Sequence, residues 1–180
     1  MQVIAGSSMP PWIGSWVTRK SVLDARRSSF RVFATAVHGL ATWPRPAIGL
    51  LGMSYLGQLS SFQAAASEAQ RHSLTLVSAA GDQGQSVHFD ACEYTPGFVP
   101  SVLTVGATDR RDAKSGFSNG GDCVNVMAPG EGLVSAGCDA DDAELRNLSG
   151  SGYAAALAAG AAALMLSEPL ARAARGRRLA

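Results

Sequence analysis

Apolar residues occur along this chain in blocks that polar or glycine-containing turns separate, and the spacing within each block predicts its structure. The run at 46–57 is apolar on both faces, as expected of a central strand in a parallel sheet. From 58 to 73, alanines and Phe62 recur at helical spacing, which predicts an amphipathic helix. A strand and loop are predicted at 74–84, and a short strand followed by a helix-like stretch begins at Ser21. The residues expected on the water-facing side of the helix are Glu68, Gln70 and Arg71.

The longest apolar block, 153–166, follows a polar turn of alternating serine and glycine at 149–152. Alanine and leucine dominate it, and both are strong helix formers, so a helix is predicted. The block carries no charge and is apolar all round, yet it is too short to span a bilayer. It therefore predicts a helix buried in the core. A helix entered through such a turn is also a frequent mount for a nucleophilic serine.

Composition narrows the class of protein. With 180 residues, of which 47% are hydrophobic and 16% charged, the chain can form one globular domain with a substantial core. The net charge of +1 gives no general attraction to nucleic acid or to membranes. Cys92, Cys123 and Cys138 match no metal-binding spacing, and at least one of them must stay unpaired within the chain. Which two could pair stays open.

The two ends of the chain carry weaker signals. Residues 1–20 show no usable periodicity and no basic-then-apolar secretory signal, an absence that is informative only if Met1 is the true start. The segment 169–180 contains four arginines, which favour a solvated basic tail or a truncated terminus over a patch for nucleic acid or membrane. The organisation expected is thus one domain at 21–168 with flanking ends.

The apolar helix and its turn resemble the nucleophile motif of the subtilisin-like serine proteases, Gly-Thr-Ser-Met-Ala-x-Pro-His-Val-Ala-Gly. Aligned without a gap, the two motif glycines fall on Gly150 and Gly160, and the nucleophilic serine falls on Gly152. Ser151 matches the threonine of the motif, so its hydroxyl should point elsewhere. A register in which Ser151 is the nucleophile would need a deletion in the turn and is the less favoured alternative. The resemblance implies a retained scaffold without its nucleophile.

Further motifs of the same family follow in the right order and cover roughly four fifths of the chain. This resemblance implies a three-layer α/β/α fold with a mostly parallel sheet, truncated on its N-terminal side. It also identifies strands at 101–109 and within 123–130. The matching segments are Val22-Leu23-Asp24, Met53-Ser54 with Gly57, 74–84, 101–109, 115–119 and 123–130.

The resemblance also implies where a substrate and an oxyanion would lie. Asp82 stands where the family has the asparagine of the oxyanion hole. An ionised aspartate offers no hydrogen-bond donor, and the loss of one such donor typically costs about a hundred- to a thousandfold in rate. A turn-capping role for Asp82 is at least as well supported. The walls of the specificity pocket are expected at Ser54, Tyr55, Leu56 and Gly57 on one side and at Ala79, Ala80 and Gly81 on the other.

None of the three positions of the family's catalytic triad is filled in this chain. The family's aspartate and histidine precede the Val-Leu-Asp strand, but residues 1–21 contain neither residue type. His38 follows that strand and is interpreted as an ordinary helix histidine. Because a serine protease needs all three groups, the chain should not hydrolyse peptides by the family mechanism. It is expected to be an inactive pseudoprotease or binding module; the alternatives are a fragment or faulty gene model of an active endopeptidase and an unrelated α/β ligand-binding protein.

The truncation also has consequences for partners. The strand near Val22 would become an exposed sheet edge, which predicts pairing with a protein partner or with a missing upstream segment. Residues 27–30 are bulkier than the glycines that the family places beside bound peptide. A protein or peptide ligand is expected, but no nucleic acid and no membrane. No cofactor motif is visible, and calcium is implied by the family resemblance alone. The compartment stays open, although the family is often secreted.

Overall fold

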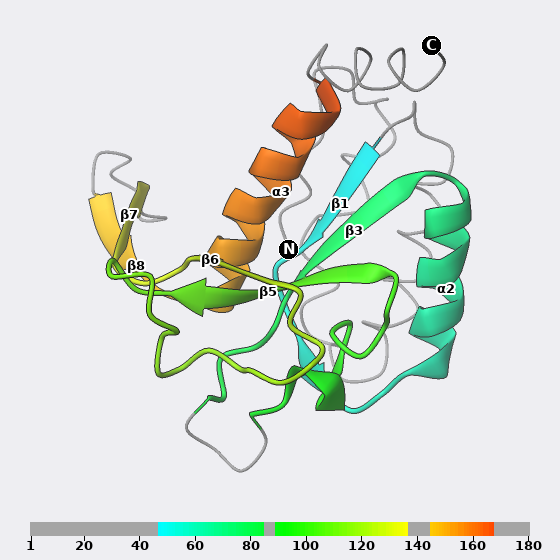
Figure 1. Cartoon of the computed structure of the whole chain (residues 1–180), viewed down its shortest axis with the longest axis horizontal. Helices are drawn as coiled ribbons and strands as arrows, with labels where there is room; N and C mark the ends of the chain where they lie inside the picture. The colour runs from blue at the N-terminus through cyan, green and yellow to red at the C-terminus, as the bar shows by residue number, and fades with distance from the viewer. Residues whose placement is uncertain (1–46, 85–88, 137–144, 168–180) are drawn as a thin grey trace, which may run out of the picture.

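A computed structural model gives the fold of the chain, and it describes residues 47–84, 89–136 and 145–167 (Figure 1). The predicted strand near Val22, His38 and the arginine-rich tail lie outside these residues, as does Cys138.

The centre of the described structure is a parallel sheet of four strands. The strands are β1 (Ala47–Leu51), β3 (Leu74–Ala79), β5 (Val102–Thr108) and β6 (Val126–Pro129), and they lie side by side in sequence order. Every neighbouring pair among the four is parallel. Parallel strands need crossover connections, and a helix forms part of the connection between β1 and β3. Helices also cover the two faces of the sheet. The predicted parallel sheet is therefore confirmed.

One face of the sheet is covered by α2 (Ser60–Arg71), which connects β1 to β3. Its buried residues recur at helical spacing and pack against alternate residues of the strands, which share one face of the sheet. The polar residues of the helix lie on its other side, so the predicted amphipathic helix is confirmed. This first core contains Phe62, Ala65, Ala66 and Ala69 from α2 and Leu74, Leu76 and Val102 from the strands.

The opposite face of the sheet is covered by α3 (Ser151–Ser167), which crosses all four strands (Figure 1). Three alanines of the helix, Ala154, Ala155 and Ala159, are buried against Val77 and Val105. Because their side chains are small, the helix can approach the strands closely. With α2 on one face and α3 on the other, the fold has three layers, α/β/α.

The prediction that α3 is wholly buried is wrong for one side of the helix. Tyr153, Leu157 and Leu164 are 39%, 50% and 68% exposed. The sheet presents a single face to α3, and only the alanine side of the helix can contact it. The described residues contain no further layer beyond the helix.

Two short antiparallel pairs and a disulfide complete the described structure. β2 (Tyr55–Leu56) pairs with β4 (Tyr94–Thr95), which directly follows a single 3-10 turn, η1 (Ala91–Glu93). β7 (Leu133–Ala136) pairs with β8 (Leu145–Leu148), and β8 leads into α3. The sequence left the pairing of the cysteines open; the structure joins Cys92 to Cys123 in a disulfide.

Candidate functional site

The candidate site lies where the carboxyl ends of two strands meet the amino end of α3. Gly52 directly follows β1, and Gly81 and Asp82 lie in the loop after β3. Gly152 lies in the first turn of α3. Ligands of parallel α/β sheets bind at the carboxyl ends of strands, so this is the expected edge. The structure thus brings together the positions that the family resemblance identified as nucleophile, oxyanion hole and pocket walls.

Asp82 caps α3 from a distant part of the sequence. Its Oδ1 accepts a hydrogen bond of 2.7 Å from the backbone N–H of Ser151. The first N–H groups of a helix have no partner within the helix, and a carboxylate there is also favoured by the helix dipole. The side chain therefore acts as an acceptor for the helix, whereas the capping role considered from the sequence was that of a turn.

The Ser151 hydroxyl is hydrogen-bonded to the loop that follows β3. Ser151 is 1% exposed, and its Oγ accepts a hydrogen bond of 3.0 Å from the backbone N–H of Gly81. Within the described residues the one histidine is His72, which hydrogen-bonds Glu68 at the other end of β3. Hydrogen bonds from Arg71 and His72 lower the pKa of the Glu68 carboxyl. The described part of the chain therefore places no imidazole beside Ser151.

A side chain at Gly152 would fit only if a neighbouring stretch of backbone moved. A Cβ built on this residue would lie 2.8 Å from the carbonyl oxygen of Gly52, which is a backbone atom and cannot rotate away. The loop after β1 thus closes over the position at which the family carries its nucleophile.

The two predicted pocket walls meet, but they differ in exposure. A Cβ on Gly81 would lie 2.8 Å from Ser54 Oγ, which places the two walls in direct proximity. Ala79, Ala80 and Gly81 are buried, because β3 ends inside the core. On the other wall Ser54 is half-buried, whereas Tyr55 and Leu56 are 39% and 59% exposed and Gly57 is exposed as well.

Asn119 organises the loop after β3, a role that sequence reasoning missed. It is fully buried; its Nδ2 donates to the Ala80 carbonyl at 3.1 Å, and its Oδ1 accepts from the Gln83 N–H at 2.8 Å. The backbone N–H of Asn119 also donates to the Gly81 carbonyl. Buried amides are nearly always hydrogen-bonded. The available signal was its place in the matching segment 115–119, but the segment alone did not reveal its contacts.

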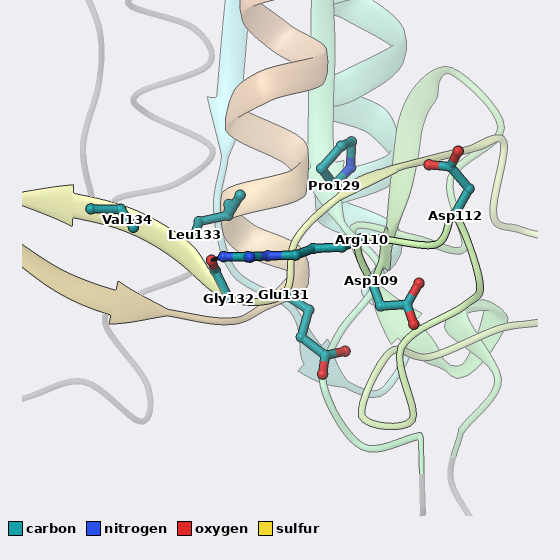
Figure 2. A pocket seen from close by; sticks show the side chains of 8 residues that line it. All are labelled: Asp109, Arg110, Asp112, Pro129, Glu131, Gly132, Leu133 and Val134. Atoms are coloured by element: carbon teal, nitrogen blue, oxygen red, sulfur yellow. Dashed lines mark hydrogen bonds between the residues drawn. The ribbon is translucent and has the colours of Figure 1, made fainter.

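A cavity of about 310 Å³ lies elsewhere, between the loop after β5 and the turn from β6 to β7 (Figure 2). Arg110 reaches across it and donates a hydrogen bond of 3.3 Å to the Gly132 carbonyl. Asp109, beside it, accepts from the backbone N–H groups of Arg111 and Ala113. None of the residues that the resemblance assigned to catalysis or substrate binding lines this cavity.

The described residues contain neither a metal-binding cluster of acidic, histidine or cysteine side chains nor a membrane-spanning helix. Across 47–84, 89–136 and 145–167, no group of three or more histidine, cysteine, aspartate or glutamate residues could hold a metal ion. The calcium implied by the resemblance therefore has no such ligand cluster in this part of the chain. No helix among these residues is long and apolar enough to cross a membrane.

Replacing Asp82 by alanine should lower the free energy of unfolding by about 1 kcal/mol, because the amino end of α3 loses its cap. Asp82→Asn keeps an acceptor oxygen in the same place and should lose clearly less. Urea denaturation followed by circular dichroism measures both variants. If Asp82→Asn proved as unstable as Asp82→Ala, the negative charge and not the hydrogen bond would be what stabilises the helix.

Comparison with known proteins agrees with this geometry. Residues 25–174 match the model of the subtilase family of peptidases. The chain is 38% identical over 112 residues to alkaline serine exoprotease A of Vibrio alginolyticus, and 37% identical over 110 residues to an extracellular serine proteinase of a Thermus species. These matches cover 62% and 61% of this chain but 20% and 26% of the two relatives.

The fold is similar to that of a solved relative. A cold-adapted subtilisin-like serine proteinase superposes with a TM-score of 0.65 at 33% identity, over 74% of this chain and 46% of that protein. The chain thus spans less than half of the solved protein and about a quarter or less of the two sequence relatives. An unrelated α/β ligand-binding protein is excluded by the family match. The chain belongs to the subtilase family, and it corresponds to the carboxyl-terminal half of the family's serine protease domain.

Proposed function

We propose that this chain is a catalytically inactive member of the subtilase family, a pseudoprotease that binds a polypeptide without cleaving it. The observation that carries the proposal is the glycine at position 152, where the family's nucleophile would be, with a neighbouring carbonyl 2.8 Å from any Cβ at that position. Removal of the nucleophile or the base alone can lower the rate of a serine protease by about a millionfold.

The surroundings of Gly152 support the same proposal. An oxyanion hole needs donors directed at the developing charge. Asp82 directs an acceptor oxygen at the amino end of α3 and so occupies the N–H of Ser151. The oxyanion of a peptide bond attacked here would face a carboxylate where the family has an amide donor.

A polypeptide is the ligand class that fits the retained features. The two pocket walls are still adjacent, and Tyr55 and Leu56 present apolar surface beside them. The strand predicted near Val22 remains a further candidate for pairing with an extended segment of a partner or with an upstream part of the same protein. The near-neutral net charge of +1 favours no anionic polymer or membrane surface.

The compartment proposed for the chain is an oxidising one. Cys92 and Cys123 form a disulfide, and disulfides persist mainly in secreted and extracellular proteins. One of the relatives is an extracellular proteinase. Both observations support export of the protein that contains this chain.

A hydrolysis assay tests the proposed function. Incubation of the purified chain with casein labelled by a self-quenching fluorophore should release no fluorescence above a buffer control, whereas subtilisin at the same concentration releases it rapidly. Progressive release that co-purifies with the chain and stops with a serine-directed inhibitor would refute the proposal.

A second candidate function is a role as one part of an active serine endopeptidase. It is favoured by one observation: the chain covers only 20% and 26% of the length of two serine protease relatives. The intact mass and N-terminal sequence of the native protein decide between the two. A larger protein with upstream aspartate and histidine motifs and a serine at position 152 would establish that the protein is an active endopeptidase. A glycine at position 152, whether the native protein has 180 residues or more, supports the pseudoprotease.

A further inference from the structure

The cavity between the loop after β5 and the turn from β6 to β7 is separate from the candidate site. Its volume of about 310 Å³ lies at the lower end of the range for small-ligand sites, roughly 300–1,000 Å³. Most of the lining is apolar, and Pro129, Leu133 and Val134 contribute to it. We call it the Arg110 cavity, after the side chain that lies across it.

The charged residues of the Arg110 cavity are mainly acidic. Asp109, Asp112 and Glu131 line it, and Arg110 is the one basic residue of the lining. Three negative charges against one positive charge leave a surplus of two negative charges. The cavity therefore combines an apolar lining with a negative potential.

Two of these carboxylates are open to a ligand. Asp109 is engaged, because its Oδ1 accepts from the backbone N–H groups of Arg111 and Ala113 and so fixes the loop. Asp112 and Glu131 are exposed, and neither side chain forms an ion pair or hydrogen bond with another residue of the part of the chain that the structure describes. Their oxygens face water and can accept from an incoming donor.

The Arg110 side chain shows that an aliphatic arm with a guanidinium group fits this cavity. Figure 2 shows the arm extended across it, with Leu133 on one side and the carboxylates of Asp109 and Glu131 on the other. The guanidinium donates one hydrogen bond of 3.3 Å to the Gly132 carbonyl. Guanidinium groups are planar and weakly hydrated, and they form paired hydrogen bonds with carboxylates.

Apolar surface continues from the Arg110 cavity onto the β7–β8 hairpin. Val134 lines the cavity and is 62% exposed. Leu145 pairs with Ala136, two positions along β7 from Val134, so Leu145 and Val134 lie on the same face of the hairpin. Leu145 is 70% exposed. An apolar strip beside an acidic cavity favours a polypeptide with a basic side chain over a free small cation.

We propose that the Arg110 cavity binds an arginine side chain of a partner polypeptide. Charge complementarity identifies this occupant: its guanidinium donates to the open carboxylates of Asp112 and Glu131 and offsets part of the surplus negative charge. Its aliphatic arm packs on the apolar lining, and the neighbouring apolar residues of the partner contact Val134 and Leu145. Because the cavity contains none of the positions assigned to catalysis or substrate binding, the proposal stands whether or not the chain cleaves peptides.

Titration of the isotope-labelled chain with two short peptides tests the proposal by nuclear magnetic resonance. Acetyl-Leu-Arg-Leu-amide should shift the backbone amide signals of Arg110, Gly132 and Val134. Acetyl-Leu-citrulline-Leu-amide has nearly the same shape without the charge and should bind at least about tenfold more weakly. Binding of the arginine peptide should also weaken as salt is added, because the carboxylates are exposed.

A charge-removing variant locates the contact. The chain with Asp112→Asn and Glu131→Gln keeps the size of both side chains, and the dissociation constant of the arginine peptide should rise about tenfold. Asparagine tolerates the positive φ of 60° at position 112, so the loop should keep its conformation. Asp122→Asn is the matched control, because Asp122 is exposed and does not line the cavity; the dissociation constant should not change.

Several results would overturn the proposal. They are an absence of shifts at the cavity residues with millimolar arginine peptide, equal binding of the citrulline peptide, and an equal loss of binding in the Asp122→Asn control. Shifts confined to 54–57 and 79–81 would place the peptide at the pocket walls instead. The comparison of the two peptides uses the unmodified chain, so it decides the question even where a variant is unstable.

Discussion

Replacing Gly152 by serine should not create a peptidase, and the variant should be less stable than the unmodified chain. Because the described residues place no histidine beside position 152, a new hydroxyl should stay at its ordinary weak nucleophilicity, and the rate should remain about a millionfold below that of an intact triad. The new Cβ would lie 2.8 Å from the Gly52 carbonyl oxygen, so the backbone of the loop after β1 must move. Overpacking of this kind costs about 1–3 kcal/mol.

Gly152→Ala is the matched control, because it adds the same Cβ without the hydroxyl. Both variants should lose similar stability in urea denaturation, and neither should hydrolyse a chromogenic peptide. Measurable hydrolysis by the serine variant and not by the alanine variant would mean that a base reaches position 152, contrary to this account. An unchanged free energy of unfolding in both variants would mean that the loop at Gly52 moves without destabilising the fold.

The variant with both Cys92→Ser and Cys123→Ser should lose about 3–4 kcal/mol of unfolding free energy. The disulfide closes a loop across a sequence separation of 31 residues, and chain-entropy estimates for such a loop give this value. The loss is a large part of the stability of a typical domain, so a substantial fall in the urea midpoint is expected. Because the cross-link joins the residues around η1 to the loop before β6, both segments should become more accessible to protease.

Cys138→Ser keeps the cross-link and serves as the matched control for the loss of a cysteine. Reduction of the unmodified chain with dithiothreitol should reproduce the effect of the double variant, whereas the control should still respond to the reductant. If the double variant unfolded at the same urea concentration as the unmodified chain, the Cys92–Cys123 disulfide would not stabilise the fold, contrary to this prediction.

Much of the fold could be predicted from local sequence patterns. β1, β3 and α2 were found because hydrophobic periodicity reports which faces of an element are buried. β5 and β6 came from the resemblance, as did the proximity of the pocket walls. The elements found from periodicity depend on residues close together in sequence, whereas the pocket walls at 54–57 and 79–81 are distant in sequence and were placed by the resemblance alone.

The features that the sequence did not reveal depend on distant residues. Asp82 and Ser151 are 69 positions apart, and their hydrogen bond exists only because two strand ends and a helix start meet. The choice of Cys92 and Cys123 among three cysteines is a matter of distance in the fold. The exposure of Tyr153 and Leu157 was missed for another reason: an apolar composition predicts a buried helix, but burial also depends on which layers of the fold pack around it.

The reaction of the purified chain with a fluorophosphonate probe tests the central claim most directly. The probe forms a covalent bond with an activated serine, and mass spectrometry of the intact protein detects the adduct. The account predicts that the mass stays at 18.5 kDa while subtilisin, treated in parallel, is fully labelled. A stoichiometric adduct on Ser151, blocked by prior treatment with a peptide inhibitor of serine proteases, would show an activated nucleophile and contradict the account.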